Sequence, residues 1–302
     1  MIFLTQIIEL AKQLNIDCIQ NESMKKHTTF KIGGDARVMV FPKTAQHIAD
    51  IVKLCNQHNI RYMAIGNGSN LLVSDDGIDA CVIVVGKDFA DVSLVDETTI
   101  YAQAGASLTK VCRFALENSL TGLEFAFGIP GTCGGGAFMN AGAYGGELKD
   151  VLIKSEHIDK DGNIESIDVA DMNLSYRHSA YYDNGCIISG LYFKLQKGDS
   201  ALIKEKMDEL MQRRKDKQPV ELPSAGSTFK RPEGYFAGAL IEQCNLKGAS
   251  VGDAQVSTKH AGFVINKGNA TCKDVLDLCS YVSKTVQDQK GVALEMEIRV
   301  TK

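Results

Sequence analysis

The chain has 302 residues, a net charge of −4, 23% charged residues and 44% hydrophobic residues. These values suit an ordinary folded protein of two or three domains, and they exclude a basic surface that would hold nucleic acid or an anionic membrane. Nine cysteines with no CxxC pair, and no Cys/His spacing that fits zinc, indicate a reducing compartment and no metal site.

The first part of the chain predicts helices alternating with short strands. An amphipathic helix is expected at 2–15 without the basic start of a signal peptide, and no apolar run approaches transmembrane length. A soluble, cytoplasmic protein is therefore expected. The elements that follow are a helix at 44–59, strands at 62–65, 81–85, 92–95 and 99–103, and a helix at 107–118.

Two glycine-rich segments are the most informative features of the sequence. Residues 66–70 read GNGSN directly after an expected strand, and residues 128–146 hold eight of the chain's 28 glycines. Glycine lets backbone approach a ligand closely and turn N–H groups toward negative charge. Two such loops suggest a dinucleotide or nucleotide-linked ligand, although the Rossmann GxGxxG fingerprint and the P-loop motif are both absent. Tight turns alone are the alternative, and a helix opening within 131–139 is expected to face the ligand.

The rest of the chain predicts an antiparallel group of strands and then a different C-terminal part. Strands are expected at 151–158, 163–168 and 186–195, with a hairpin turn at 161–162. A domain boundary is placed at 196–200. The elements beyond it are helices at 201–217, 235–244 and 271–288, and strands at 261–265 and 293–300.

Three segments carry side chains suited to catalysis. Residues 223–230 (PSAGSTFK) set Ser227 among small residues, where a positioned hydroxyl can donate a proton; a turn-forming serine is the alternative. Arg177, in the segment SYRHS, can bind a carboxylate or phosphate or make only a surface ion pair. The alternation in 293–300 puts Glu295 and Glu297 on one face of the expected strand. The alternative to a catalytic role is that this face is simply exposed to solvent.

Taken in order, these motifs resemble those of the UDP-N-acetylenolpyruvoylglucosamine reductase family. The matching segments are 28–34 (TTFKIGG), 66–72 (GNGSNLL), 128–132 (GIPGT), 140–146 (NAGAYGG), 175–177 (SYR), 223–230 (PSAGSTFK) and 294–297 (LEME). The resemblance implies an α+β protein: a two-subdomain FAD-binding fold of the vanillyl-alcohol-oxidase (PCMH-type) superfamily, then a C-terminal α+β substrate domain. The implied limits are 1–80 and 81–197 for the two FAD-binding subdomains and 198–302 for the substrate-binding domain.

The resemblance also implies the activity. It implies a monomeric, FAD-dependent oxidoreductase that uses NADPH to reduce UDP-N-acetylglucosamine enolpyruvate to UDP-N-acetylmuramate for peptidoglycan and cell wall synthesis, with no nucleic acid or membrane partner. Carried over by position, Ser227 is the proton donor, and Arg177 and Glu297 stabilise the negative charge that develops on the substrate. The chain resembles the shorter type II form, because residues 182–195 leave no room for the substrate-covering loop of the longer form.

The resemblance further implies the binding residues. The implied FAD contacts are Gly66, Asn67, Gly68, Ser69, Asn70, Leu71, Gly128, Ile129, Gly131, Thr132, Gly134, Gly135, Ala141, Gly142 and Gly145. The glycine run at 134–136 is expected to turn its backbone N–H groups toward the pyrophosphate. The implied substrate contacts are Tyr176, Lys230 and His260, and Arg231 stands where the longer form often has asparagine. Two rivals are an oxygen-using oxidase on the same scaffold and a nucleotide-sugar-binding protein without catalysis.

Overall fold

The structure is a computed structural model that describes residues 2–302, and it divides into two compact units. Unit 1 consists of the described part of Met1–Gln20, with Val38–Asn67 and Ala80–Gln212; unit 2 consists of Asn21–Arg37, Gly68–Asp79 and Arg213–Lys302. The domain limits implied by the resemblance concern binding function, and they stay a prediction. In the described part of the chain, no helix has the length and apolar character needed to cross a membrane.

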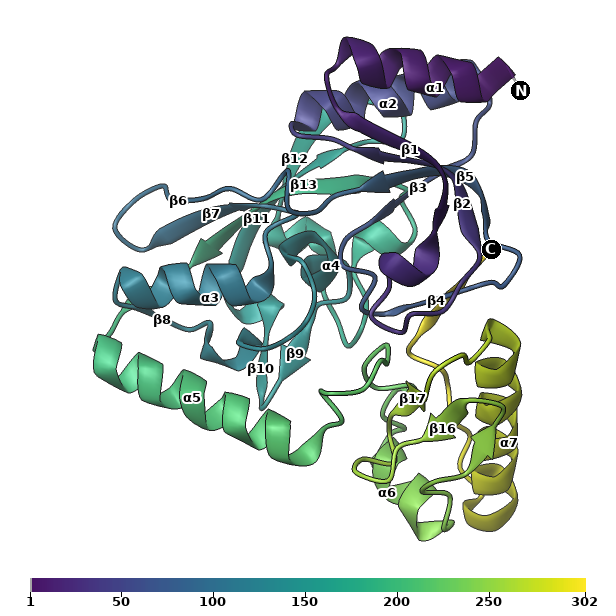
Figure 1. The fold of residues 1–302 in the computed structure, drawn as a ribbon. Coiled ribbons are helices and arrows are strands. Elements are labelled where there is room, and N and C mark those ends of the chain that lie inside the picture. Colours follow the sequence, from purple (N-terminus) through teal and green to yellow (C-terminus); the bar gives the residue numbers. More distant parts are fainter. Residues whose placement is uncertain (1) are drawn as a thin grey trace. The chain divides into compact units, whose positions relative to one another are not determined.

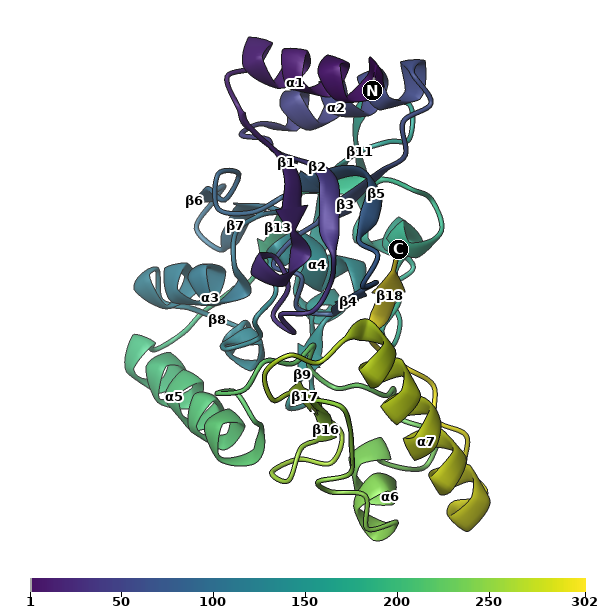
Figure 2. The ribbon, with the colours of Figure 1, turned by 45° about the vertical axis from the view of Figure 1, so that its right-hand side comes forward.

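A four-stranded sheet has the order β1-β2-β5-β3, with β3 parallel to β5. Its strands are β1 (Asp17–Ser23), β2 (Asp35–Phe41), β3 (Tyr62–Ile65) and β5 (Ile78–Val84). Helices α1 (Ile2–Gln13) and α2 (Ala45–Gln57) lie side by side in both ribbon views (Figures 1 and 2). The Thr44 side chain caps α2 by accepting the His47 N–H group. The GNGSN loop leaves this sheet at the C-terminal end of β3.

A five-stranded antiparallel sheet in unit 1 has the order β12-β11-β13-β7-β6. Its strands are β6 (Val92–Leu94), β7 (Thr99–Gln103), β11 (Leu152–Ile158), β12 (Ile164–Asp168) and β13 (Ile187–Lys194). Helix α4 (Cys133–Phe138) packs on β13 and β7, and α3 (Leu108–Glu117) packs on β8 (Leu120–Thr121). The antiparallel group predicted from the sequence is confirmed here. Helix α5 (Ser200–Lys217) follows this sheet in the chain.

Unit 2 contains a three-stranded sheet, two helices and a two-stranded parallel pair. The elements are β4 (Leu71–Val73), α6 (Ala237–Gln243), β15 (Ser250–Val251), β16 (Ala254–Val256), β17 (Val264–Asn266), α7 (Cys272–Lys290) and β18 (Arg299–Thr301). A capping box of Thr271 and Asp274 begins α7, and Gly291, with φ of +70°, ends it. Strand β18 pairs in parallel with β4, the strand that follows the GNGSN loop.

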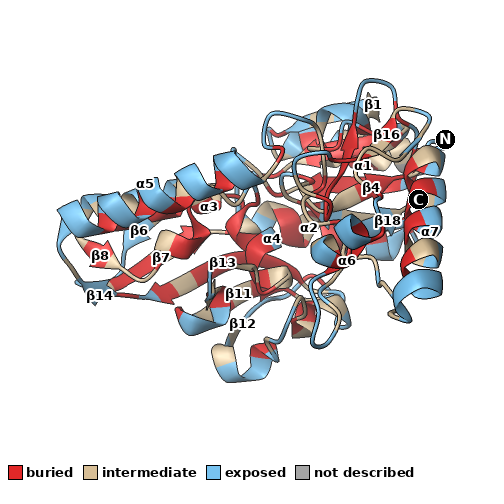
Figure 3. Ribbon diagram, turned by 90° about the horizontal axis from the view of Figure 1, so that it is seen from below, coloured by how far each residue is buried: buried red, intermediate tan, exposed pale blue. Residues whose placement is uncertain are grey.

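Buried residues form two cores, one in each unit, which appear red in Figure 3. The short elements that complete the fold are β8 (Leu120–Thr121), β9 (Gly142–Ala143), β10 (Gly146–Glu147), β14 (Gln196–Lys197) and the 3-10 helices Met24–Lys26, Glu124–Ala126, Leu148–Asp150, Val169–Met172 and Ala180–Tyr182. The mixture of helices and antiparallel sheets confirms the α+β class.

The structure corrects two strand predictions and adds strands that were not predicted. The strand expected at 261–265 is β17 at Val264–Asn266. The strand expected at 293–300 is regular only over Arg299–Thr301, because the residues before it pair at a single bridge between Phe229 and Met296. No prediction covered β1 and β2; β1 reads DCIQNES, a polar sequence without the alternation that marks a half-buried strand.

Candidate active site

The two glycine-rich segments meet in unit 1. The side-chain amide of Asn67 donates a 2.8 Å hydrogen bond to the carbonyl oxygen of Pro130. A Cβ atom added at Gly66 would lie 2.3 Å from the hydroxyl oxygen of Thr132, so only glycine allows this close approach. The structure therefore brings together predicted cofactor contacts that are far apart in the sequence.

Several backbone N–H groups in these loops donate to no other backbone group within residues 2–302. Among them are those of Gly131 and Thr132 in unit 1 and of Gly68 and Ser69 in unit 2. Gly131, Thr132 and Gly68 are buried, and Gly68 has φ of +59°. Buried N–H groups are rarely left unpaired, and successive N–H groups at a left-handed residue form a concave anion site. Both loops therefore present donors that suit phosphate oxygens.

Helix α4 begins inside the second glycine-rich segment, but it uses its first N–H groups within the chain. Gly134 donates to the carbonyl oxygen of Ala104 at 2.8 Å, and Gly135 donates to the hydroxyl of Thr132 at 3.2 Å. The N–H group of Gly136 donates to the Thr132 carbonyl oxygen at 2.8 Å. The expectation that this glycine run turns its own N–H groups to a ligand is therefore wrong, and the unbonded donors precede the helix.

The three glycines of α4 serve different purposes. A Cβ atom at Gly134 would lie 2.8 Å from the Cβ of Ala104, and one at Gly136 would lie 3.0 Å from a methyl carbon of Leu148. These two positions need glycine for packing. Gly135 is exposed, and its added Cβ would meet a single side-chain oxygen at 3.4 Å. The chain itself therefore has room for a side chain at Gly135.

The remaining predicted cofactor contacts lie at turns beside α4. Gly128 and Gly145 have φ of +83° and +93°, and no atom lies within 4 Å of a Cβ built at Gly145. Gly142 lies in the hairpin of β9 and β10. Ile129 packs on the core of unit 1, as does Ala141. These positions are compatible with a ligand contact, and their role stays a prediction.

Arg177 lies in a two-residue turn in unit 1. Ser175 and His178 exchange two backbone hydrogen bonds, of 3.1 Å and 3.2 Å, which leaves Tyr176 and Arg177 at the tip. Arg177 has φ of +55°, a region that non-glycine residues occupy only when their surroundings hold them there. Its guanidinium carbon lies 5.1 Å from the ring centroid of the exposed Tyr176. The structure thus brings two predicted site residues together.

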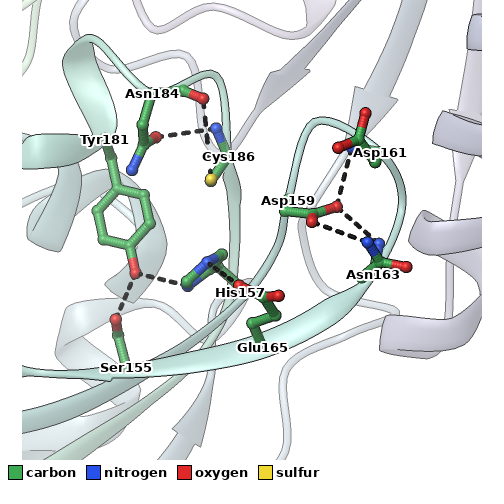
Figure 4. A network of polar contacts seen from close by, with 9 residues as sticks. All are labelled: Ser155, His157, Asp159, Asp161, Asn163, Glu165, Tyr181, Asn184 and Cys186. Atoms are coloured by element: carbon green, nitrogen blue, oxygen red, sulfur yellow. Dashed lines mark hydrogen bonds and ion pairs between the residues drawn. The ribbon is translucent and has the colours of Figure 1, made fainter.

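The segment after this turn is anchored to the five-stranded sheet by a buried polar network (Figure 4). The hydroxyl of Tyr181 forms a short hydrogen bond with the Ser155 hydroxyl and lies 3.1 Å from Nδ1 of His157. Burial lowers the pKa of His157 against the opposing effect of nearby carboxylates, so the ring stays neutral. The hydroxyl of Ser179 donates to the carbonyl oxygen of Phe138 at 2.8 Å.

Ser227 and Glu297 lie on adjacent extended segments of unit 2. The N–H group of Glu297 donates to the carbonyl oxygen of Thr228 at 2.8 Å, and Phe229 forms an antiparallel bridge with Met296. Thr228 is buried, whereas Ser227 and Glu297 are half-buried. This pairing brings a hydroxyl and a carboxyl group, which are far apart in the sequence, to neighbouring backbone positions.

The GNGSN loop is tied to the segment that carries Glu297. The side-chain amide of Asn70 donates to the carbonyl oxygen of Glu297 at 3.2 Å, and the Asn70 carbonyl oxygen accepts the N–H group of Arg299 at 2.9 Å. Leu71 continues this contact, because it pairs with Arg299 where β4 meets β18. Two predicted cofactor contacts of unit 2 therefore adjoin the chain that holds a predicted catalytic residue.

The predicted substrate contacts in unit 2 are a lysine and a histidine. Lys230 pairs with Glu295, with 2.5 Å between Nζ and Oε1, and its N–H group donates to the Glu295 carbonyl oxygen at 2.8 Å. His260 accepts the Gly262 N–H group at Nδ1 and packs edge-on against Phe263. Burial lowers the pKa of His260, so this ring also favours its neutral form.

The sequence predicts catalytic side chains but not the residues that hold them in place. Thr228 and Asn140 were not predicted as functional residues, although their hydrogen bonds fix the backbone beside predicted catalytic residues. Their position inside motifs, at 140–146 and 223–230, was the available signal.

Arg177 belongs to unit 1, and Ser227 and Glu297 belong to unit 2. Within residues 2–302, no group of three or more His, Cys, Asp or Glu side chains could hold a metal ion.

Comparisons with known proteins agree with this arrangement. A family model described as UDP-N-acetylenolpyruvoylglucosamine reductase, C-terminal domain, matches residues 218–301, and one described as FAD binding domain matches residues 36–168. Proteins named UDP-N-acetylenolpyruvoylglucosamine reductase from Clostridium novyi and Caldanaerobacter subterraneus are 48% and 49% identical over 280 residues, which is 93% of this chain and 91% and 92% of theirs. The crystal structure of the reductase of that name (MurB) from Thermus caldophilus has a TM-score of 0.80 and 33% identity, and the match covers 95% of this chain and 99% of that chain.

Proposed function

This chain belongs to the UDP-N-acetylenolpyruvoylglucosamine reductase family, and we propose that it uses NADPH to reduce UDP-N-acetylenolpyruvoylglucosamine to UDP-N-acetylmuramate for peptidoglycan synthesis. It is a flavin-binding oxidoreductase with FAD as its cofactor, and it has an FAD-binding domain and the C-terminal domain of the reductase family. We also propose that the protein acts in the cytoplasm as a monomer.

We propose that each glycine loop offers backbone N–H groups to the phosphate groups of FAD. Within the described chain, the N–H groups of Gly131, Thr132, Gly68 and Ser69 donate to no other backbone group. They can therefore donate to phosphate oxygens. Gly135 offers an open surface beside the first pair. When bound, FAD would supply the hydride transfer between NADPH and the substrate. The protein supplies binding, orientation and charge.

Ser227 is proposed as the proton donor to the substrate. Addition of a hydride to the terminal carbon of the enolpyruvyl group leaves negative charge on the carbon next to the carboxylate. That carbon is a strong base, so a serine hydroxyl held in place can protonate it and complete the lactyl ether. The backbone of Thr228, fixed through the N–H of Glu297 and the carbonyl oxygen of Gly262, restrains the adjacent Ser227.

Arg177 and Glu297 are proposed to stabilise the charge that precedes this proton transfer. Arg177 acts through its permanent positive charge, and its left-handed backbone is consistent with a residue held for function. Glu297 acts as a hydrogen-bond partner, either protonated or through its neighbours. Lys230, His260 and Tyr176 are proposed to contact the nucleotide-sugar part of the substrate.

One observation supports this assignment most strongly: the backbone pairing of Thr228 with Glu297 in unit 2. It joins the PSAGSTFK and LEME segments, which are separate in the sequence, and these are the two segments whose residues the family resemblance marks as proton donor and carboxylate. A flavin oxidase on the same scaffold has no need of a hydroxyl and a carboxyl group at these two positions.

The function can be tested with purified, FAD-loaded protein under anaerobic conditions. NADPH should bleach the flavin absorbance, and UDP-N-acetylenolpyruvoylglucosamine should restore it with formation of UDP-N-acetylmuramate. Reoxidation by molecular oxygen but not by this substrate would point to an oxidase. A colourless protein that does not take up FAD would contradict every flavoenzyme assignment and leave a nucleotide-sugar-binding protein.

A further inference from the structure

Asn140 ends helix α4 at a position that usually takes glycine. Its φ is +42°, its N–H group donates to the carbonyl oxygen of Ala137 at 3.1 Å, and the N–H group of Ala141 donates to that of Gly136 at 2.8 Å. These two bonds form the Schellman motif, whose left-handed residue is usually glycine and sometimes asparagine. The segment 128–146 already holds eight glycines, so the presence of asparagine instead of glycine at this position indicates that its side chain has a function.

Asn140 is 1% exposed, and its side chain makes three hydrogen bonds to two separate parts of unit 1. Its Nδ2 donates to the carbonyl oxygen of Ser175 at 3.1 Å and to Oε2 of Glu147 at 2.9 Å, and its Oδ1 accepts the Lys149 N–H group at 3.0 Å. Two acceptors on one side and a donor on the other fix the orientation of the amide. The residue thus joins the glycine-rich segment to the start of the Arg177 turn.

The conformation of Arg177 depends on that turn. Ser175 and His178 close it with two backbone hydrogen bonds, and Arg177 between them has φ of +55°. A non-glycine residue in this region keeps its conformation only where the surrounding structure holds it. The network of Figure 4 anchors the segment after the turn, and Asn140 anchors the segment before it.

We propose that Asn140 is a positioning residue for Arg177: by holding the Ser175 carbonyl group, it sets the direction of the guanidinium during substrate reduction. This inference rests on the proposed function, because it takes Arg177 as the group that stabilises negative charge on the substrate. The pKa of Glu147 lies below its usual range, mainly because its carboxylate is hydrogen-bonded to the Lys149 ammonium. The Asn140 amide and the charge of Arg177 lower this pKa further. Glu147 therefore stays ionised at neutral pH and remains an acceptor for the amide.

The test variant is Asn140→Gly, which keeps the left-handed backbone accessible and removes the three side-chain bonds. FAD content and flavin reduction by NADPH should stay at the wild-type level. Reoxidation by UDP-N-acetylenolpyruvoylglucosamine should slow by about tenfold or more, since misplacing a reacting group by about 1 Å can cost a hundredfold.

Asn173→Gly is the matched control. Asn173 is also left-handed, with φ of +47°, and lies in the same segment just before Ser175. Its side chain is exposed and makes no hydrogen bond to the described residues. Both half-reactions of this control should match the wild type. Amide hydrogen exchange at 175–178 should be faster in Asn140→Gly and unchanged in Asn173→Gly, which reports on the turn without any turnover.

A double variant separates positioning from general stability. In an Arg177→Lys background, adding Asn140→Gly should slow reoxidation by less than about twofold, because the guanidinium that it positions is already gone. A further tenfold loss in that background would overturn the proposal. Loss of FAD from Asn140→Gly, or equal slowing of both half-reactions, would assign the residue a structural role and overturn it as well.

A second substitution keeps the proposal testable if Asn140→Gly does not fold. Asn140→Asp keeps the size and the acceptor for Lys149 but removes both donors, and it should show the same selective slowing of substrate reduction. Failure of both variants to fold would overturn the proposal. A wild-type protein that the substrate does not reoxidise would instead refute the proposed function, an outcome visible before any variant is made.

Discussion

At the scale of single residues, the hydroxyl of Ser227 has the most specific role to test. Ser227→Ala removes the proposed proton donor but leaves the pairing of Thr228 with Glu297, which uses backbone atoms alone. Flavin reduction by NADPH should stay nearly intact. Reoxidation by the enolpyruvyl substrate should slow by a factor of about 10² or more, the usual contribution of general acid catalysis. Rapid anaerobic mixing measures both steps, and equal slowing of both would indicate a structural role.

Glu297 and Glu295 form a matched pair for a second residue-scale prediction. Glu297 is half-buried beside the backbone of Thr228, whereas the Glu295 side chain is 72% exposed and binds the ammonium of Lys230. Glu297→Gln keeps the size and loses the ionisable group, so it should slow substrate reduction and spare flavin reduction by NADPH. Glu295→Gln should change turnover much less, with at most a modest effect on stability.

Single-turnover rates of both glutamine variants decide this assignment. Comparable losses, or a greater loss at Glu295, would show that the catalytic carboxylate had been assigned to the wrong residue. Sequence patterns could not separate the two glutamates, because period-two alternation gives them the same face. The separation rests on family position, and the structure adds different surroundings: an exposed ion pair for Glu295 and a half-buried site for Glu297.

At the scale of elements, helix α4 offers a test of the cofactor site. Gly135→Val adds a side chain at an exposed position where the chain has room, so the protein should stay folded while FAD occupancy falls sharply. The flavin-to-protein absorbance ratio measures occupancy. Gly134→Val serves as the contrast, because its Cβ would lie 2.8 Å from that of Ala104 and should lower thermal stability. Full flavin occupancy in Gly135→Val would mean that the glycine run of α4 does not contact the cofactor.

Elements with a clear pattern were predictable, and those defined by distant partners were not. Strands β3 and β7 lie at Tyr62–Ile65 and Thr99–Gln103, the ranges expected from the sequence, because turn residues bound each apolar run. The segment 294–298 alternates between apolar and charged residues but finds a partner at a single bridge. The same holds at the start of α4: the N–H groups of Cys133 and Gly134 donate to residues 106 and 104, which belong to a loop that local patterns do not place beside the helix.

At the scale of the whole molecule, the sequence could not reveal how the compact units are assembled. Unit 2 combines Asn21–Arg37 and Gly68–Asp79 with the C-terminal Arg213–Lys302. Composition changes predict boundaries along the chain, such as the one expected at 196–200, but they carry no information about segments that return to a distant unit. The domain limits implied by family resemblance stay a prediction about binding, to be tested with ligands.

Each unit contains a histidine that responds to acid in the same direction. Burial lowers the pKa of His157 in unit 1 and of His260 in unit 2. As the pH falls through about 6.5, the usual pKa of histidine, the two rings bind protons in the unfolded chain but not yet in the folded chain. The contribution of the two neutral rings to the free energy of unfolding should therefore be complete above that pH, and the free energy of unfolding should decrease below it. For His157, Glu165 and Asp159 oppose this effect without outweighing burial.

Urea unfolding at a series of pH values measures this effect. His157→Gln and His260→Gln should each make the fall in the free energy of unfolding between about pH 7.5 and 5.5 shallower. Carboxylates whose pKa is lowered, such as Glu147 and Asp159, act at more acidic pH and leave this window to the histidines. An unchanged slope in both variants would show that the two rings titrate normally in the folded protein.

The parallel pairing of β4 with β18 has a consequence for the order in which the protein matures on the ribosome. Asn70 and Glu297 are hydrogen-bonded across 227 residues of chain. During translation, the GNGSN loop is among the early segments to emerge, yet β4 has no partner until residues 299–301 have been made. Nascent chains fold from the N-terminus as they appear. Strand β4 must therefore wait for its partner through most of synthesis, and this pairing of unit 2 forms only when the last residues of the chain have been made.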